Sequence, residues 1–466
     1  MQYDLDKYNS IELGDRTLSE RFATALQQLG SAPEASVRKA CGNASQSKAV
    51  YRLVDNVKTT VEAINKEQHE KTVERIRGSG VPIILVAQDT TTLKYTTLKE
   101  TEGLGPIGSD HRSKGLLLHS ALALQTNGKP LGILNQKIWA RPPQEETNRS
   151  ASEKRQRNIE RNIEEKESYR WLETMERAEY GLTGEQTVIH ICDREGDIYE
   201  FYEKASREGR KILVRRVKNR RIKDDQYKYL EEYLNKQAVS GEMTVHVPAD
   251  SHTKREERDA QLQIRYGKVT VLRPRDVKSL NKLAETVTIQ VISAHEINVP
   301  DGVEGISWRL VTNLDVQDVE TAREYIGWYA RRWMIEMFHY TLKSGCTVEK
   351  LQYDSADKLM KLIMMYSIIA AWIMWMTYLA RTEPEASCEI ELTPREWKIL
   401  YCVAKQTKKP PAKPPTIHQA VILIAMLGGF SGYKSSGFPG VKSIWWGWTK
   451  FDTILNASNY IANFVG

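Results

Sequence analysis

The sequence predicts an α/β protein: a mixed β-sheet with helices packed on it, interrupted by an antiparallel β insertion and flanked by helical regions. Three observations support this fold class. Short apolar segments alternate with helical segments in the central part of the chain. A series of strand-like segments with polar turns follows them. The apolar side chains of residues 1–68 and of the last fifty residues have helical spacing, so both ends are expected to be helical.

The central segments give the predicted sheet its order. Three strands come in sequence, followed by a helix, a strand, a helix and a fifth strand, which is the order of the RNase H-like fold. The predicted strands lie at 83–89, 115–125, 131–141, 187–193 and 211–217, and the insertion spans about 222–305. We therefore predict three domains: a helical domain at 1–68, an RNase H-like domain at 69–380 and a second helical domain at 381–466.

The composition is that of a globular chain. Of 466 residues, 41% are hydrophobic and 27% are charged, which excludes a largely disordered protein. The five cysteines are scattered, without a CxxC pair or a Cys/His cluster, so neither a zinc site nor a disulfide framework is indicated. This cysteine usage fits a reducing, intracellular setting, and the polar N-terminus does not have the pattern of a signal peptide.

Positive charge is concentrated in one run. The net charge is +7, and the segment from Arg210 to Lys223 holds eight basic residues and no acidic one. Such a run is typical either of a surface that follows nucleic-acid phosphates or of a solvated protein face. Taken alone, the run does not decide between these two interpretations.

One apolar stretch is long enough to cross a bilayer. Residues 362–380 carry no charge. A helix buried in a large soluble domain is apolar all round as well, and no second span of this kind is present in the sequence. We favour the buried helix over the membrane helix.

Two aspartates follow predicted strands directly. Asp89 ends the first strand and Asp193 ends the fourth. If these strands are neighbours, the carboxylates meet at one edge of the sheet and can share a divalent metal ion. A helix cap or a turn is the common alternative for an aspartate in this position.

A third carboxylate lies in a helix predicted over about 319–344. Counted from Tyr329, Arg332, Glu336 and Lys343 follow at offsets of 3, 7 and 14, so that all four fall within an arc of about 60° on a continuous helix. That face would present a metal ligand beside groups that bind phosphate. A surface helix with chance ion pairing is the alternative.

The pattern Y-x2-R-x3-E-x6-K resembles the signature of the DDE transposases of the IS-four family, and within it the branch of transposon Tn-five. The segments CDREGDIYEF (192–201) and QDTTTLKY (88–95) are similar to the family's sequences around the first two carboxylates. LGDRTLSERF and SKAVYRLVDN resemble its N-terminal DNA-binding segment, and LGGFSGYKSSGFPGVKSIWWGW resembles its C-terminal dimerisation segment. The resemblance therefore extends over nearly the whole chain.

The resemblance implies a role for each matched residue. Asp89, Asp193 and Glu336 would be the catalytic triad and would bind Mg²⁺ or Mn²⁺, with two ions in each active site. Tyr329, Arg332 and Lys343 would hold DNA near the cleaved end, and the indole of Trp308 would stack on a flipped base. The further expected DNA contacts are Arg215, Lys48 and Arg52, with surface helix charges as the alternative for the last two.

The resemblance also implies an activity and a setting. The family excises and reinserts an insertion sequence by nicking, hairpin formation, hairpin opening and strand transfer at inverted-repeat ends. The implied partners are double-stranded DNA, target DNA and a second copy of the chain, without a membrane, in the cytoplasm of a prokaryote at its nucleoid. A DNA-binding inhibitor without catalysis and a simple metal-dependent nuclease are the alternatives.

Overall fold

The computed structural model describes residues 5–108, 113–143, 150, 152–153, 156, 160–182, 184–247, 256–275, 282–432 and 437–465. The chain forms two compact units. The first unit comprises Met1–Val81, Thr90–Gln144 and Met334–Gly466. The second unit comprises Pro82–Asp89 and Glu145–Trp333. The chain passes from the second unit back into the first between Asp89 and Thr90.

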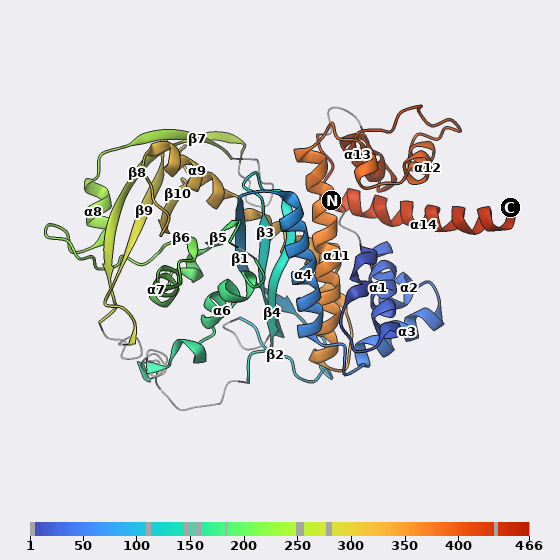
Figure 1. Ribbon diagram of the computed structural model, residues 1–466, viewed down its shortest axis with the longest axis horizontal. Coiled ribbons are helices and arrows are strands. Elements are labelled where there is room, and N and C mark those ends of the chain that lie inside the picture. Colours follow the sequence, from blue (N-terminus) through green and yellow to red (C-terminus); the bar gives the residue numbers. More distant parts are fainter. Residues whose placement is uncertain are drawn as a thin grey trace. The chain divides into compact units, whose positions relative to one another are not determined.

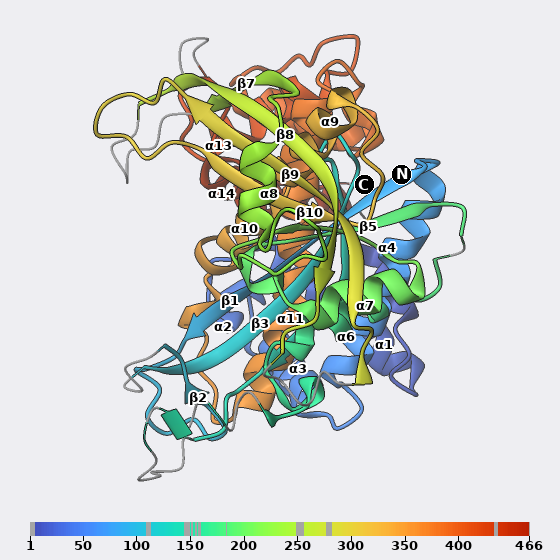
Figure 2. The same cartoon turned by 90° about the vertical axis from the view of Figure 1, so that its left-hand side faces the viewer.

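The second unit is built on one long sheet. Its strands, in spatial order, are β1 (Ile83–Lys94, of which the part up to Asp89 lies in this unit), β5 (Thr187–Cys192), β6 (Lys211–Arg215), β10 (Ser307–Thr312), β9 (Thr286–Ile297), β8 (Arg258–Leu272) and β7 (Gly241–Val247). β1, β5 and β6 are parallel, and each later pair is antiparallel. β8 and β9 are the long ribbons that run side by side in Figures 1 and 2.

Helices and sheet share one apolar core in the second unit. The helices are α6 (Tyr169–Ala178), α7 (Tyr199–Glu208), α8 (Leu230–Lys236) and α9 (Val319–Ala330). Trp171 of α6 and Phe201 of α7 are fully buried, together with valines and isoleucines of β6, β8 and β9. β6 buries three successive side chains, Ile212 to Val214, because a central parallel strand is covered on both faces.

The first unit combines the outer strands with most of the helices. Its strand order is β2 (Gly105–Pro106), β3 (Lys114–Leu124) and the remainder of β1, and β4 (Pro130–Trp139) pairs with β3. Its described α-helices are α1 (Arg16–Ser31), α2 (Val37–Ala40), α3 (Ala44–Asp55), α4 (Val61–Ser79), α10 (Trp333–Tyr340, in this unit from Met334), α11 (Ala356–Thr382), α12 (Pro394–Ala404), α13 (Ile417–Leu427) and α14 (Val441–Val465). α4 and α11 lie side by side against β4 (Figure 1).

The apolar stretch lies in the core of the first unit. α11 is the one described helix that is long and apolar enough to cross a membrane, and 94% of its most apolar window is buried inside the protein. It packs against α1, α4, α13 and α14 as well as β4. Polar contacts reach it too, since Gln136 on β4 donates a hydrogen bond to Ser367 at 3.2 Å. This burial agrees with the core-helix interpretation.

The predicted α/β architecture is confirmed in its main features. The five predicted core strands correspond to β1, β3, β4, β5 and β6, and the first and fourth of them are parallel neighbours. The insertion is antiparallel, as expected, and β10 joins it to β6. Both ends of the chain are helical. The boundaries of the three predicted domains stay a prediction.

The single long helix predicted over 319–344 is wrong. α9 ends at Ala330, a turn occupies Arg331 and Arg332, and α10 (Trp333–Tyr340) begins after it. Tight bonds from Arg331 N to Trp328 O (3.0 Å) and from Arg332 N to Tyr329 O (2.9 Å) close the last turn of α9. A short π-helix, Thr341–Gly345, follows α10. The 60° face drawn on one continuous helix therefore does not apply.

Candidate active site

The end of the β1–β5 pairing brings two aspartates together. Asp193 directly follows β5 as predicted, but β1 continues to Lys94, so the prediction that Asp89 ends its strand is wrong. Gln88 pairs with Cys192 in parallel register, so Asp89 and Asp193 follow at the same carboxyl-terminal edge. Burial raises the pKa of Asp193, and the negative charge of Asp89 raises it further. Electrostatic coupling of this kind requires the two carboxylates to be close. A pair of half-buried, mutually repelling carboxylates fits a hard divalent cation, which takes oxygen ligands.

Asp193 also caps the turn that follows β5. Its Oδ1 accepts a hydrogen bond from Glu195 N at 2.8 Å at the start of the 3₁₀-helix Arg194–Gly196. Gly196 lies against β5 so closely that a Cβ there would be 2.7 Å from the Cβ of Cys192. The cap and the carboxylate pair therefore coexist, and the backbone of this turn holds Asp193 in place.

A third carboxylate of the second unit lies beside this pair. Burial raises the pKa of Glu195, Arg170 opposes that effect, and Asp193 and Asp89 add to it. Glu195 forms an ion pair with Arg170 of α6. Sequence reasoning missed Glu195, although it lies two residues after Asp193 in the segment that carried the resemblance.

Four residues later than Asp193, a buried aspartate anchors the basic run. Asp197 is 1% exposed and forms an ion pair with the buried Arg220. Its Oδ2 accepts from Val217 N and Lys218 N, both at 2.7 Å, and its Oδ1 accepts from the Tyr202 hydroxyl at 2.8 Å. Burial acts to raise the pKa of Asp197, but Arg220 and the two backbone N–H groups outweigh it and lower the pKa. The loop after β5 and the loop after β6 are therefore fastened to each other.

Predicted DNA-binding residues gather around Tyr329 at the end of α9. Tyr329 is 4% exposed, and its ring meets that of Trp308 edge-on at 6.1 Å and 67°. Burial raises the pKa of Tyr329, while the positive charges of Arg332 and Arg215 lower it. Arg332 also lowers the pKa of Asp193. Within the second unit, the structure thus brings four further predicted residues near Asp193 or Tyr329, namely Asp89, Arg215, Trp308 and Arg332.

Glu336 and Lys343 belong to the first unit. Glu336 is half-buried on α10. Lys343 lies in the π-helix, where its Nζ donates to Thr92 O of β1 at 2.9 Å and lies 3.8 Å from the carboxylate of Glu349. Among the residues that the structure describes, no three His, Cys, Asp or Glu side chains are grouped so as to hold a metal ion. The place of Glu336 beside Asp89 and Asp193 stays a prediction.

The remaining two predicted contacts lie on α3 of the first unit. Lys48 and Arg52 are one helical turn apart, and both are exposed. Asn43 caps this helix by accepting from Gln46 N at 2.9 Å. The opposite side of α3 buries Val50 and Leu53, so the two basic side chains extend from a fixed helix into solvent.

Comparison with known families identifies the two ends of the chain. Residues 2–59 match a model described as transposase DNA-binding, and residues 368–465 match one described as the transposase Tn5 dimerisation domain. The chain carries both terminal domains of a Tn5-type transposase. The resemblance to this branch of the IS-four family is thereby confirmed, and Lys48 and Arg52 lie inside the matched DNA-binding domain.

A solved transposase is distantly similar. The piggyBac transposase, seen by cryo-EM in a synaptic complex with hairpin DNA, matches 82% of this chain and 73% of its own at 9% sequence identity and a TM-score of 0.35. At that TM-score the likeness carries no argument about this transposase.

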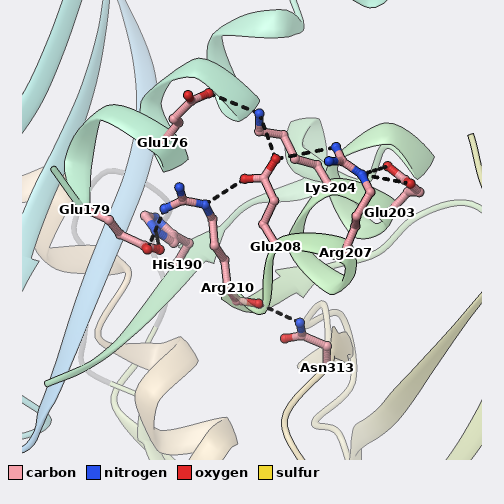
Figure 3. Close-up of polar contacts among 9 residues, drawn as sticks. All are labelled: Glu176, Glu179, His190, Glu203, Lys204, Arg207, Glu208, Arg210 and Asn313. Carbon is pink, nitrogen blue, oxygen red and sulfur yellow. Dashed lines mark hydrogen bonds and ion pairs between the residues drawn. The ribbon is translucent and has the colours of Figure 1, made fainter. Parts of the chain in front are cut away.

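A buried polar network around His190 supports the paired ends of β1 and β5 in the transposase. His190 of β5 is fully buried, with Nδ1 2.9 Å from the side-chain nitrogen of Gln88 and Nε2 2.9 Å from Glu179. An amide N–H at Nδ1 and a carboxylate at Nε2 place the ring proton on Nε2. Figure 3 shows Glu179 between His190 and Arg210, and the carboxylate of Glu179 accepts a hydrogen bond of 2.5 Å from Arg210. Because Gln88 directly precedes Asp89, this network fixes the part of β1 that carries the carboxylate.

The network continues along the surface of α7. Arg210 also binds Glu208, and Glu208 binds Lys204, which reaches Glu176 of α6 (Figure 3). Asn313 fastens the start of β6 by donating to Arg210 O at 2.6 Å and accepting from Ile212 N at 3.0 Å. No sequence signal indicated these pairings, because their members are spread from α6 to the segment after β10.

The basic run serves two purposes in the transposase. Arg210, Arg216 and Arg220 form ion pairs inside the protein with Glu179, Glu231 and Asp197. Arg216 is only 2% exposed. The other basic side chains are half-buried or exposed: Lys211, Arg215, Lys218, Arg221 and Lys223. Neither interpretation of the run was complete, since part of it stabilises the fold and part reaches the surface.

Proposed function

We propose that this transposase acts as a homodimer and cuts and rejoins DNA by a cut-and-paste mechanism at inverted-repeat ends. The observation that carries the proposal is the pair of carboxylates directly after the last paired residues of β1 and β5, with Arg332 and Tyr329 close to one of them. The DNA-binding and dimerisation matches at the two ends of the chain support the partners.

Each step breaks one phosphodiester bond, and the attacking group is either water or a 3′-hydroxyl of the DNA. Water attacks at the element's end and leaves a 3′-hydroxyl. That hydroxyl attacks the opposite strand and forms a hairpin, which a second water opens. The restored 3′-hydroxyl then attacks target DNA, and the target's own 3′-oxygen leaves.

Asp89, Asp193 and Glu336 would hold Mg²⁺ or Mn²⁺, with two ions in each site, which activate the attacking oxygen and stabilise the leaving one. The raised pKa of Asp193 supports this assignment, because a nearby dication favours the ionised carboxylate that burial and Asp89 disfavour.

The chain's other residues would bind and orient the DNA. Arg332 offers a planar guanidinium that can bind two phosphate oxygens at once, and Lys343 offers a point charge. Tyr329 can donate its phenolic proton to a phosphate, since its raised pKa keeps that proton in place at neutral pH. Trp308 is half-exposed beside Tyr329 and offers an indole face for a base turned out of the duplex.

The decisive experiment is cleavage of labelled DNA that carries the element's own ends, in Mg²⁺ or Mn²⁺. The wild type should yield hairpin-ended product, and Glu336→Ala should bind the DNA without cutting it. Glu324→Gln on α9 is the matched control, because Glu324 is an exposed carboxylate of the same region and should leave cleavage unchanged.

Two outcomes would replace the proposal. Nicking without hairpins would indicate a simple metal-dependent nuclease. DNA binding without any cleavage by the wild type would indicate an inhibitor of transposition. Retained cleavage in Glu336→Ala would remove Glu336 from the triad.

A further inference from the structure

A cavity at one corner of the second unit's sheet is lined with arginines. It has a volume of about 290 Å³, and its lining comprises Arg221, Leu272, Arg273, Pro274, Arg275 and Glu285. Three guanidinium groups face one carboxylate, so the lining carries a net positive charge. A water molecule's share of the liquid is about 30 Å³, so the cavity can hold a larger anionic group with its hydration.

Backbone pairing builds the cavity from three separate segments. The end of the basic run continues the sheet beside β8, with Leu272 N donating to Arg221 O and Lys223 N donating to Thr270 O, both at 2.8 Å. Arg273 N donates to Glu285 O, also at 2.8 Å, which joins the end of β8 to the start of β9. Arg221 thus comes together with Arg273 and Arg275, which lie 52 or more residues later in the sequence, on hydrogen-bonded backbone.

The side chains of the lining are held in part by backbone oxygens. Arg221 Nη2 donates to Arg273 O at 3.3 Å, and Arg273 Nη1 donates to Leu283 O at 2.6 Å. A guanidinium has five N–H donors, and bonds of this kind fix the orientation of the Arg221 and Arg273 side chains in the lining. Arg275 is exposed at the rim, and Arg221 and Arg273 are half-buried.

The buried anchor of the basic run explains why Arg221 reaches this cavity. Arg220 turns inward to Asp197, and adjacent residues of an extended segment point to opposite sides. Arg221 is therefore directed away from that ion pair. The surface part of the run is joined at this place by two further arginines, Arg273 and Arg275, from the segment after β8.

We propose that this cavity is a phosphate-binding site. It contacts the DNA backbone at a place other than the cleavage site. The inference rests on the proposed function for its source of phosphate, namely DNA. Arginine is suited to such a site because its planar fork matches two phosphate oxygens. A phosphate contact positions the duplex without reading its sequence.

The test compares the salt dependence of DNA binding between two double variants of the full chain. Arg221→Gln with Arg275→Gln removes two charges from the cavity. Lys236→Gln with Lys268→Gln removes two exposed charges of the same unit outside it. Each lost phosphate contact lowers the slope of log K against log[salt] by about 0.9, so the cavity variant should lose about 1.8 and bind about 60-fold more weakly in 0.1 M salt.

A second arm uses inorganic phosphate as the probe, measured as a thermal shift without DNA. A loss of slope in the cavity variant, with the control unchanged, supports DNA as the occupant. A phosphate-induced shift that only the cavity variant loses, with DNA binding intact, supports the site with free phosphate as its ligand. Equal behaviour of both variants in both arms would overturn the proposal.

Cleavage of end DNA by the same samples separates this inference from the proposed function. If the wild type cuts, and the cavity variant matches the control in DNA binding, in cleavage and in the phosphate-induced shift, the cavity proposal fails alone. If the wild type neither binds nor cuts element ends, the proposed function fails, and the phosphate arm still tests the cavity. Matching melting temperatures of both variants confirm that folding is not the cause.

Discussion

Removal of the Asp197 carboxylate tests the fastening of the two loops most directly. Asp197→Ala leaves the guanidinium of Arg220, which is 7% exposed, buried without its counter-charge. Breaking a buried ion pair by removing one partner costs about 3–5 kcal/mol. The N–H groups of Val217 and Lys218 lose their acceptor as well, at about 1–3 kcal/mol for each unsatisfied group, although such terms do not add fully.

The expected loss of at least about 3 kcal/mol is a large fraction of the total stability of a folded unit, about 5–15 kcal/mol. Denaturant unfolding measures it, and hydrogen exchange of residues 211–235 shows where the fold loosens. The control is Glu320→Ala, which breaks a pair whose carboxylate is 72% exposed, leaves Arg323 bonded to Glu242 O, and should cost about 1 kcal/mol or less. Equal losses in Asp197→Ala and Glu320→Ala would refute the reasoning.

The pH dependence has a defined sign. The pKa of Asp197 is lower in the folded protein than its ordinary value of 3.8, so its charge contributes stability above that value. The contribution is lost as the pH falls through the lowered pKa. The stability difference between wild type and Asp197→Asn should therefore be full at neutral pH and shrink in acid.

Three further predictions concern the site. Asp193→Asn keeps the cap but removes a carboxylate whose pKa is raised in the folded protein. Because a raised carboxyl pKa makes the folded protein less stable as the pH rises, the variant should melt at a higher temperature than the wild type at pH 7 without divalent metal, and it should lose cleavage. A lower melting temperature would contradict this. Trp308→Ala should reduce hairpin formation about 5- to 150-fold, corresponding to about 1–3 kcal/mol of base stacking, with Phe restoring much of it; unchanged hairpin yield in a gel assay would exclude stacking. Lys48→Gln with Arg52→Gln should lower the salt slope of DNA binding by about 1.8, and an unchanged slope would mean that neither contacts phosphate.

The sequence predicted the sheet because each core strand carries its own apolar pattern. β1 begins with the apolar run from Ile83 to Ala87, and β5 and β6 are short and mostly apolar, as parallel strands require. The order of elements selected their neighbours. The parallel pairing of β1 with β5 then placed Asp89 beside Asp193 without further information. The break between α9 and α10 was not predicted, because Arg331 and Arg332 are good helix formers and no Gly or Pro marks the turn.

Pairings between distant segments were beyond the sequence pattern. His190 looked like one more residue of a buried strand, and only the fold brings Gln88 and Glu179 to its two nitrogens. The same is true of the basic run. Its composition does not distinguish Arg220, which faces a buried aspartate, from Arg221, which faces a cavity.

The turn that follows β5 separates two kinds of selection. A library screened for soluble protein alone should reject most changes at Gly196, which has no room for a Cβ beside Cys192, and at Asp197, which holds a neighbouring loop. The same screen should accept Asn at Asp193, because an amide caps the turn as well as a carboxylate does. A screen for excision should reject that amide. Within these five residues, the difference between the two screens would therefore mark Asp193 as the residue kept for chemistry rather than for folding.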